Sequence, residues 1–359
     1  MAHISWFDRY DPSLEHTLGG KNTSLGILTS AGLPVPRGFA VTAEAYRRAL
    51  SDTGVGAAVL NLLTDLDVAD QMMLAATALA ARETVLSIPL PDWLMVPLAE
   101  AYEELSQRCG LADVPVAVRS SATCEDQPDA SFAGEHDTYL WVRGADAVAE
   151  HVRRCWASLF TDRAISYRRQ VRYADAGAAM SVGVQEMVLP TAAGVAFTLN
   201  PIDGDRSQVA IDASWGLGEA VVGGVVTPDN FLVDKVMGTI TRRTISSKTV
   251  EYRLDEHDRV AEVPVDDARR DVPCLDDDEV LAVARLARRA EKHYGCPQDV
   301  EWAIDPRLPE GDNVVLLQSR PETVWSRKPR TVASGAEDTF HSIVNTLRDP
   351  NRGRLAAAG

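Results

Sequence analysis

Two neighbouring segments carry acidic, amide and guanidinium side chains at spacings that could serve phosphate chemistry. Residues 299–305 alternate between polar and apolar types, which is typical of a half-buried strand. Asp299 and Glu301 would share one face of that strand, because successive side chains point to opposite sides. The prolines and glycine of residues 306–312 predict a turn, and residues 314–320 predict a second strand. The two segments together predict a hairpin.

The length of the turn suggests which residues of this hairpin lie opposite each other. If Asp305 pairs with Val314 across the turn, counting back along both strands places Glu301 opposite Gln318. A carboxylate and an amide oxygen would then lie side by side on one face of the hairpin.

The polar face of the hairpin suits a magnesium ion and phosphate groups. In the same register Asp299 lies opposite Arg320, so two carboxylates, an amide oxygen and a guanidinium converge. Because Mg²⁺ prefers oxygen ligands and keeps several waters and phosphate oxygens, Glu301 and Gln318 can supply the protein's share of its ligands. Arg320 would then face phosphate. The alternative is a solvent-exposed hairpin with a surface ion pair.

Two basic residues in the first third of the chain are further candidates for phosphate binding. Lys21 follows two glycines and precedes a predicted helix, a place where backbone N–H groups and positive charge favour anions. The segment is not a Walker A sequence, and a simple capped helix is the alternative. Arg119 ends the β-branched run 114–118, and its guanidinium could bind phosphate oxygens in a fork. An ordinary surface arginine is the alternative there.

A loop of small residues follows this second basic residue. Residues 129–135 combine small side chains with the hydroxyl of Ser131, the aromatic ring of Phe132 and the flexible backbone of Gly134. Such a loop could close over a triphosphate and exclude water. The alternative is a surface loop that places Phe132 in the core.

An apolar strand and a glycine-rich turn complete the candidate elements. Gln185, Glu186 and Val188 lie on the strand, where backbone groups could pair with the edge of an adenine ring and apolar neighbours could enclose it. Residues 214–219 form the turn, which could hold a metal-bound phosphate or shape the surrounding lobe.

Composition and charge restrict the class of protein. The chain has 359 residues, of which 45% are hydrophobic and 25% charged, a globular composition of a size that favours two domains or two packed lobes. Its net charge of -16 argues against nucleic acid and anionic membrane as partners. An ATP site in such a chain must gather cations locally, which makes the position of each lysine and arginine informative.

Cysteine usage and the first residues favour a cytoplasmic location. The five cysteines form no Cys-x-x-Cys pair and are odd in number, so we expect reduced thiols. Residues 1–10 lack the pattern of a secretory signal, and no uncharged run approaches the length of a membrane span.

The chain is predicted to fold into two lobes and a tail. We expect lobes at 1–180 and 181–325, and a tail at 326–359 with a short helix at 336–347. Helices are predicted at 22–31, from Ala43 after a Thr42 cap, at 56–83, at 147–159, and between an Asp276 cap and Gly295. Strands of the second lobe are predicted at 181–189, 193–199, 207–213, 221–226 and 230–235.

The order of these motifs resembles the N-terminal domain of the phosphoenolpyruvate synthase family, which includes pyruvate phosphate dikinase and rifampin phosphotransferase. The resemblance covers about residues 5–325. It is carried by LGGKNTSLG at 18–26, LPVPRGFAVT at 33–42, VRSSAT at 118–123, DASFAGE at 129–135, VQEMV at 184–188, SWGLGEAVV at 214–222, TPDNF at 227–231, DVEW at 299–302 and LLQSRP at 316–321.

The resemblance implies an α/β (α+β) chain with an ATP-grasp fold, in which two lobes clamp Mg-ATP. Residues that match the family's site would serve as follows: Lys21, Arg119 and Arg320 as catalytic, phosphate-facing cations, Glu301 and Gln318 as magnesium ligands with Asp299 nearby, Gln185, Glu186 and Val188 around the base, and Ser131 to Gly134 as the covering loop.

In the family, phosphate passes from ATP to a histidine on a swivelling domain and then to a small acceptor bound elsewhere, leaving AMP. None of the seven histidines lies in the family's carrier motif. His136, beside the covering loop, is the one candidate for a local acceptor, and a surface residue is the alternative.

Three functions remain open from the sequence. In the first, the chain is the ATP-binding subunit of a split enzyme that needs a histidine-carrying subunit and an acceptor-binding subunit; phenylphosphate synthase, whose acceptor is phenol, has this layout. In the second, it is an excised domain of a single-chain phosphoenolpyruvate synthase or rifampin phosphotransferase. In the third, it is an ATP sensor without turnover.

Overall fold

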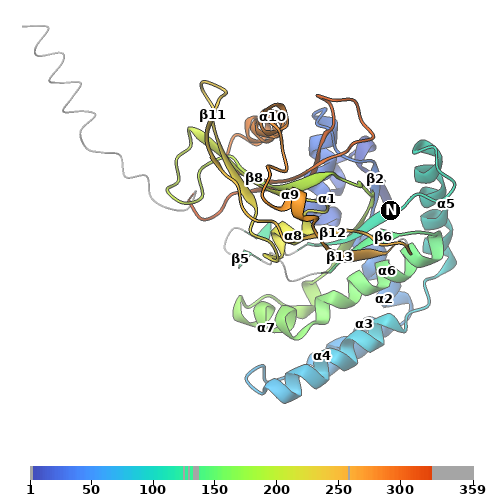
Figure 1. The fold of residues 1–359 in the computed structure, drawn as a ribbon. Coiled ribbons are helices and arrows are strands. Elements are labelled where there is room, and N and C mark those ends of the chain that lie inside the picture. The colour runs from blue at the N-terminus through green and yellow to red at the C-terminus, as the bar shows by residue number, and fades with distance from the viewer. Residues whose placement is uncertain (1–2, 124–125, 128–129, 132–136, 258, 326–359) are drawn as a thin grey trace, which may run out of the picture. The chain divides into compact units, whose positions relative to one another are not determined.

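Helices and strands are mixed throughout the computed structural model, which describes residues 3–123, 126–127, 130–131, 137–257 and 259–325 (Figure 1). The helices are α1 (Glu15–Ser30), α2 (Ala43–Asp52), α3 (Val55–Leu63), α4 (Gln71–Leu86), α5 (Asp92–Arg108), α6 (Ala145–Ala157), α7 (Asp162–Gln170), α8 (Glu219–Val222), α9 (Asp267–Arg270) and α10 (Asp277–Tyr294). Among the described residues, none of these helices combines the length and apolar character that crossing a bilayer requires.

Most of the described strands belong to two antiparallel sheets. The first has the order β1 (Ile4–Trp6), β2 (Gly38–Val41), β7 (Met180–Glu186), β3 (Val116–Ala122) and β6 (Thr138–Val142). The second has the order β11 (Ile240–Thr244), β10 (Asp229–Asp234), β9 (Gln208–Trp215), β8 (Ala192–Phe197), β14 (Gln298–Ile304) and β15 (Val314–Pro321). Two short ribbons pair β12 (Val250–Leu254) with β13 (Val260–Pro264), and β4 (Asp126–Gln127) with β5 (Ala130–Ser131).

Each sheet has its own core. Helices α2 to α6 cover one face of the first sheet, where Phe39 and Trp156 are fully buried (Figure 1). Helix α10 covers one face of the second sheet over Phe231 and Trp302. Burying an aromatic side chain of this size stabilises a fold by about 1.5–3 kcal/mol. Each sheet therefore has a hydrophobic layer of its own and leaves its other face for further contacts.

Helix α1 contacts strands of both sheets. It packs against β3 and β7 of the first sheet and against β15 of the second. The hydroxyl of Ser24 donates to the Ser319 carbonyl oxygen at 2.9 Å, and Leu28 is buried in the core of the second sheet. Residues 1–321 form one compact unit that holds both sheets. Residues 322–359 are a second unit, of which only 322–325 are described, so the predicted tail helix lies outside the described residues.

The predicted helix ends are confirmed where capping side chains mark them. The Thr42 hydroxyl accepts from the Ala45 N–H at 3.3 Å at the start of α2. Asp276 and Glu279 form a reciprocal capping box at the start of α10, and Gly295 ends that helix with a φ of 69°. Local side-chain hydrogen bonds mark the two helix starts and a left-handed glycine marks the end of α10, so the sequence was sufficient to place them.

Three predicted elements differ from the structure. The helix expected at 56–83 is two helices, because Asp70 accepts from the N–H groups that begin α4. The helix expected at 22–31 begins earlier, since α1 continues through a non-helical Gly19. The strand expected at 221–226 is wrong: the Val222 N–H donates to the Gly218 carbonyl within the helical turn of α8.

The change from one sheet to the other lies later than the predicted boundary near residue 180. Strand β7 pairs with β2 and β3, so the strand expected at 181–189 belongs to the first sheet. The second sheet begins with β8 at Ala192. Local composition changes near residue 180, but strand pairing is a long-range property that this change does not report.

The predicted hairpin of β14 and β15 is present with one irregularity. Glu301 lies opposite Gln318 and Asp299 opposite Arg320, as predicted. Next to the turn, however, Val314 pairs with Ile304 rather than with Asp305. A β-bulge absorbs the difference of one residue, since Trp302 pairs with Leu316 and leaves Leu317 as the extra residue.

Candidate nucleotide site between the two sheets

The arginine at the end of a predicted strand joins the two sheets. Arg119 on β3 donates from Nη2 to Glu301 Oε2 at 2.9 Å and to Gln318 Oε1 at 3.0 Å. Its Nη1 donates to the carbonyl oxygen of Leu317 at 3.0 Å. Leu317 is the extra residue of the bulge, so this contact ties the irregular part of β15 to the first sheet. The structure thus brings together a predicted cation and both predicted magnesium ligands.

The oxygen pair of Glu301 and Gln318 has the chemistry that magnesium requires. Both oxygens lie within 3.0 Å of one nitrogen of Arg119, which is close enough for a single cation to contact both. No cluster of three or more His, Cys, Asp or Glu side chains suited to a metal occurs in the described part of the chain. Two protein oxygens fit Mg²⁺, which completes its six ligands with water and phosphate oxygens.

A small pocket beside this pair brings in the second predicted cation. Lys21, Arg119, Gln185 and Gln318 are among the residues that line it. The Lys21 ammonium group donates to the Ser120 carbonyl oxygen on β3 at 3.4 Å. Residues from both ends of the sequence therefore meet at one place, and two of them are cations in a chain of net charge -16.

The approach of α1 to β3 depends on a glycine. Gly19 has a φ of 67°, and a Cβ atom at this position would lie 2.4 Å from the Ser121 carbonyl oxygen. Only glycine combines this backbone conformation with so close a contact. The kink at Gly19 places the following Lys21 against the strand that carries Arg119.

Two residues of the site were missed as candidates by sequence reasoning. The Asn22 side-chain amide donates to the Ser181 hydroxyl at 2.9 Å, and the Asn22 N–H donates to the Ser121 hydroxyl at 3.3 Å. Gly183 makes room for this side chain, because a Cβ atom there would lie 2.4 Å from Asn22 Oδ1. A buried asparagine after a lysine and a glycine inside an apolar strand were the available signals.

The far end of the hairpin holds the remaining charged pair. Arg320 Nε and Asp299 Oδ2 lie 3.3 Å apart. The Arg320 side chain is 50% exposed, whereas that of Asp299 is 14% exposed. A half-exposed guanidinium has room to bind a second anion, so the pair can act at the outer end of the site.

Two apolar clusters lie next to these polar groups. Ala303 is two residues beyond Glu301 on the same face of β14, and it packs with Val188, Ala193 and Val315, with Leu317 at the edge. The second cluster lies on the first sheet, where Ala117, two residues before Arg119, packs with Met187 and Leu217. Residues 187–191 connect β7 of the first sheet to β8 of the second, and they are called here the segment between the sheets. This segment contributes Met187 to one cluster and Val188 to the other, so it lies where a flat apolar group could be enclosed.

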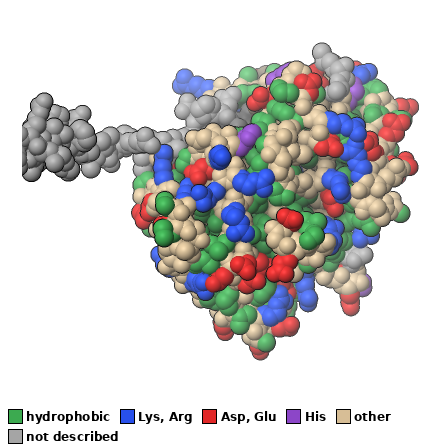
Figure 2. All heavy atoms as spheres, turned by 90° about the horizontal axis from the view of Figure 1, so that it is seen from above, with side chains coloured by type: hydrophobic (Ala, Val, Ile, Leu, Met, Phe, Trp, Pro, Cys, Tyr) green, Lys and Arg blue, Asp and Glu red, His purple; other side chains and the backbone are tan. Residues whose placement is uncertain are grey.

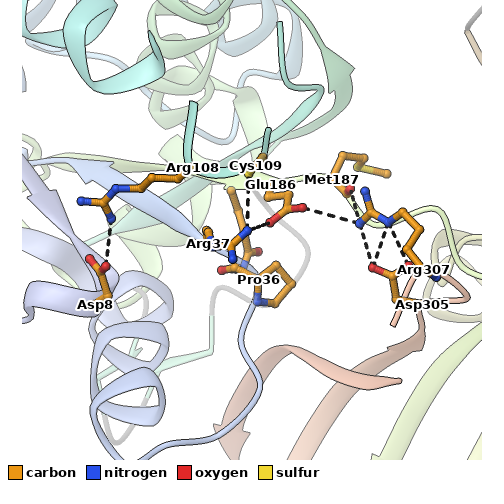
Figure 3. Close-up of polar contacts among 10 residues, drawn as sticks. Asp8, Pro36, Arg37, Arg108, Cys109, Glu186, Met187, Asp305 and Arg307 are labelled. Atoms are coloured by element: carbon orange, nitrogen blue, oxygen red, sulfur yellow. Dashed lines mark hydrogen bonds and ion pairs between the residues drawn. The ribbon is translucent and has the colours of Figure 1, made fainter. Parts of the chain in front are cut away.

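Two of the predicted base-binding residues hold the start of this segment. Gln185 donates from Nε2 to the Pro36 carbonyl oxygen at 3.3 Å, and the Glu186 N–H donates to the Arg37 carbonyl oxygen at 2.7 Å. The Glu186 carboxylate lies between Arg37 and Arg307, at 3.9 Å and 3.6 Å (Figure 3). Burial raises the pKa of the neighbouring Cys109 thiol, with a smaller contribution from the Glu186 charge. The backbone N–H of Glu186 is already used, so Val188 is the better candidate for backbone contacts to a base.

The predicted covering loop is only partly described. Ser131 lies in β5, opposite Asp126 of β4. Phe132, Gly134 and His136 lie outside the described residues. The roles of this loop and of His136 stay predictions.

Cations are not confined to the site. On the face drawn in Figure 2, Lys and Arg side chains are interspersed with Asp and Glu side chains. Arg119 differs from the exposed ion pairs because it bonds to groups of the other sheet and is only 18% exposed. Burial strengthens its electrostatic interactions relative to those of a surface arginine.

Comparison with known proteins agrees with this geometry. Residues 15–339 match the family model described as the pyruvate phosphate dikinase AMP/ATP-binding domain. The chain therefore belongs to this family, and its ATP-grasp fold, expected from the sequence, is confirmed.

Curated relatives are phosphoenolpyruvate synthases. The chain is 44% identical over 345 residues to a protein of Staphylothermus marinus described as a probable phosphoenolpyruvate synthase, covering 90% of this chain and 41% of the relative. It is 41% identical over 352 residues to the phosphoenolpyruvate synthase of Aeropyrum pernix, covering 90% of this chain and 43% of the relative. The chain thus spans less than half the length of these relatives.

Replacing Lys21 with alanine is expected to weaken Mg-ATP binding by about tenfold to a hundredfold, since a hydrogen bond to a charged group contributes about 1.5–3 kcal/mol. Isothermal titration calorimetry measures this effect. Lys235→Ala is the matched control, because Lys235 bonds to Glu291 and to the Thr198 carbonyl oxygen, away from the site. We expect the control to lower the melting temperature and to leave the ATP affinity unchanged. An unfolded Lys21→Ala protein would instead show that Lys21 is structural.

Proposed function

We propose that this chain binds Mg-ATP between its two sheets and serves as the ATP-binding part of a dikinase. The observation that supports this most strongly is the reach of Arg119 from β3 to Glu301 and Gln318 on the second sheet. A cation suited to phosphate thus lies beside two oxygen atoms of the kind that magnesium prefers, next to apolar clusters of a kind that suits a base.

Each group has a role that follows from its charge and place. Lys21, Arg119 and Arg320 would hold the phosphate chain and neutralise charge that develops during transfer. Glu301 and Gln318 would hold Mg²⁺, with Asp299 keeping Arg320 in place. Bound magnesium would draw charge from the phosphate oxygens. Around the nucleotide we place Gln185, Glu186 and Val188, with the loop that contains Ser131 and Gly134 as its cover.

Binding must rearrange the contacts of Arg119. Its guanidinium occupies the same oxygens of Glu301 and Gln318 that a magnesium ion would use. Two cations cannot share these oxygens without strong repulsion. Glu301 and Gln318 would hold the ion, and Arg119 would turn from the carboxylate to a phosphate group when Mg-ATP binds.

The phosphate acceptor is a histidine of a partner subunit or domain, which passes phosphate to a small molecule held by an acceptor-binding part. Two described histidines agree with this: the His3 ring packs at a tilt against Trp93, and His151 bonds to the Ala147 carbonyl oxygen, outside the site. The overall balance converts ATP, water and the acceptor into AMP, phosphate and the phosphorylated acceptor. The free thiols of the described cysteines agree with a cytoplasmic location.

Two acceptors merit comparison. Phenol, giving phenyl phosphate, suits a chain that works as a separate ATP-binding subunit. Pyruvate is favoured by the relatives, which are described as phosphoenolpyruvate synthases. A non-catalytic ATP sensor is less well supported, because sensing alone does not require Lys21, Arg119, Glu301, Gln318 and Arg320 together.

The test combines the chain with ATP, Mg²⁺ and a histidine-carrying domain, and follows AMP by chromatography and phosphohistidine by ³¹P NMR. We expect AMP and phosphohistidine only when both proteins are present, and loss of both products with Glu301→Gln. Adding phenol or pyruvate with the acceptor-binding part identifies the acceptor. AMP that forms equally fast from this chain alone would contradict the proposal of a partner histidine.

A further inference from the structure

A second arginine of the hairpin is held in a fixed position at the base end of the site. Arg307 lies in the turn after β14, and its Nε and Nη2 atoms donate to Asp305 Oδ1 and Oδ2 at 2.9 Å and 2.7 Å. The Arg307 N–H also donates to Asp305 Oδ1 at 3.0 Å. Asp305 is 4% exposed, so its carboxylate is fixed by its surroundings. This fork leaves Arg307 little freedom to move.

The same guanidinium reaches the segment between the two sheets. Arg307 Nη2 lies 3.6 Å from Glu186 Oε1 and donates to the Met187 carbonyl oxygen at 3.4 Å (Figure 3). Arg37 approaches the other oxygen of Glu186 at 3.9 Å, from a more exposed position. One anchored side chain of the second sheet thus contacts two successive hydrogen-bond acceptors of the segment that enters both apolar clusters.

We propose that Arg307 is a specificity-determining positioning residue, which holds the Glu186 carboxylate and the Met187 carbonyl group to accept from the 6-amino group of adenine. This inference rests on the proposed function. A carboxylate and a carbonyl oxygen only accept hydrogen bonds, so they pair with an amino group and repel the 6-oxo group of inosine or guanine. Arg307 Nε donates to Asp305, and Arg307 Nη2 donates to Asp305 and to the Met187 carbonyl oxygen, so these two nitrogens are not available to an oxo group.

The fixed position of the Glu186 carboxylate matters for discrimination. A carboxylate that could move would turn away from an oxo group and would no longer distinguish the two bases. Glu186 is at the end of β7 and has several rotatable bonds, so its position must be set by its partners. Discrimination by polar groups is strong when the wrong ligand leaves them unpaired. Removal of Arg307 should therefore weaken binding of the amino base specifically, because its acceptors are no longer held in place, while the oxo base gains or loses little.

The test compares ATP with inosine triphosphate, which differs by an oxo group in place of the amino group, on the full chain in the presence of Mg²⁺. Titration calorimetry should show a preference for ATP of at least about tenfold in the unaltered protein, as expected for one lost hydrogen bond. Arg307→Ala should lose about tenfold in ATP affinity, with inosine triphosphate changed less than about twofold. Arg307→Lys, which keeps the charge without the fork, should be intermediate.

Arg243→Ala is the matched control, since Arg243 forms an ion pair with Asp277 at 2.6 Å in another part of the second sheet. It should leave both affinities unchanged. An equal loss of both nucleotides in Arg307→Ala and Arg307→Lys would overturn the inference and show a structural role. Equal binding of the two nucleotides by the unaltered protein would overturn it while leaving nucleotide binding intact. Failure of the unaltered protein to bind either one would overturn the proposed function, and this inference with it.

Discussion

Arg119→Ala is expected to slow AMP formation by about a hundredfold to a thousandfold, the usual effect of removing one preorganised group that stabilises transition-state charge. Arg119 donates to Glu301, Gln318 and Leu317 on the other sheet. Its loss removes a cation from the phosphates and, before nucleotide binds, leaves the proposed metal ligands without their partner. The rate is measured with the histidine-carrying partner at saturating ATP.

Stability should respond much less than rate to this change. Glu301 is 27% exposed, so water can replace much of the interaction that Arg119 provides. Arg119→Lys should restore part of the rate, because it returns the charge but not the fork. Arg153→Ala is the control: Arg153 bonds to the carbonyl oxygens of Leu86 and Ile88, so its loss should affect melting alone. Equal rates in Arg119→Ala and Arg153→Ala would exclude a role for Arg119 in transfer.

Trp302→Ala is expected to lower the free energy of unfolding by about 3–5 kcal/mol, the range for truncating a buried aromatic side chain. Trp302 is fully buried between β14 and the helix that covers the second sheet. The free energy of unfolding of most domains is only about 5–15 kcal/mol, so this single change removes a large part of it. It also loosens the strand that carries Glu301, so we expect ATP binding to weaken with it. Urea denaturation followed by circular dichroism measures the loss.

Trp302→Phe separates packing from hydrogen bonding in this core. The indole N–H of Trp302 has no hydrogen-bond partner among the described residues, so phenylalanine removes volume but no bond. We expect a loss below that of Trp302→Ala, about 1–2 kcal/mol for a partial reduction in volume. If phenylalanine were as damaging as alanine, the indole N–H would have a partner that matters, and the packing explanation would fail.

Much of the site was predictable because it rests on local patterns. The alternation in residues 299–305 was sufficient to place Glu301 on one face and Trp302 on the other, and pairing across a short turn then brought Gln318 opposite Glu301. The bulge was not predictable, since an extra residue is stabilised by contacts of its carbonyl group with Arg119, nearly two hundred positions away in sequence. The predicted register was wrong by one residue next to the turn, and the bulge makes it correct from Glu301 onward.

Long-range contacts explain the other differences. No local signal indicates that β7 pairs with β2 and β3, because pairing partners depend on the whole sheet. The run at 221–226 has strand-forming residues, yet its first residues belong to a single helical turn that lies between Gly218 and Gly223. Arg307 was overlooked for a similar reason: its sequence neighbourhood is a turn, and its partners Glu186 and Met187 belong to a distant segment.

The bulge at Leu317 has a consequence for how one strand can serve a ligand of mixed character. A regular strand presents a given face only at every second residue. The bulge sets two residues of β15 opposite one of β14, and Leu317 packs at the edge of an apolar cluster while Gln318 lines the pocket of Lys21 and Arg119. Two adjacent residues of β15 can therefore contact the apolar part and the charged part of one ligand. Deleting Leu317 would restore a regular strand, in which side chains on one face are two residues apart. The apolar and the charged contacts would then be separated by one further side-chain repeat, although the residue types would be unchanged.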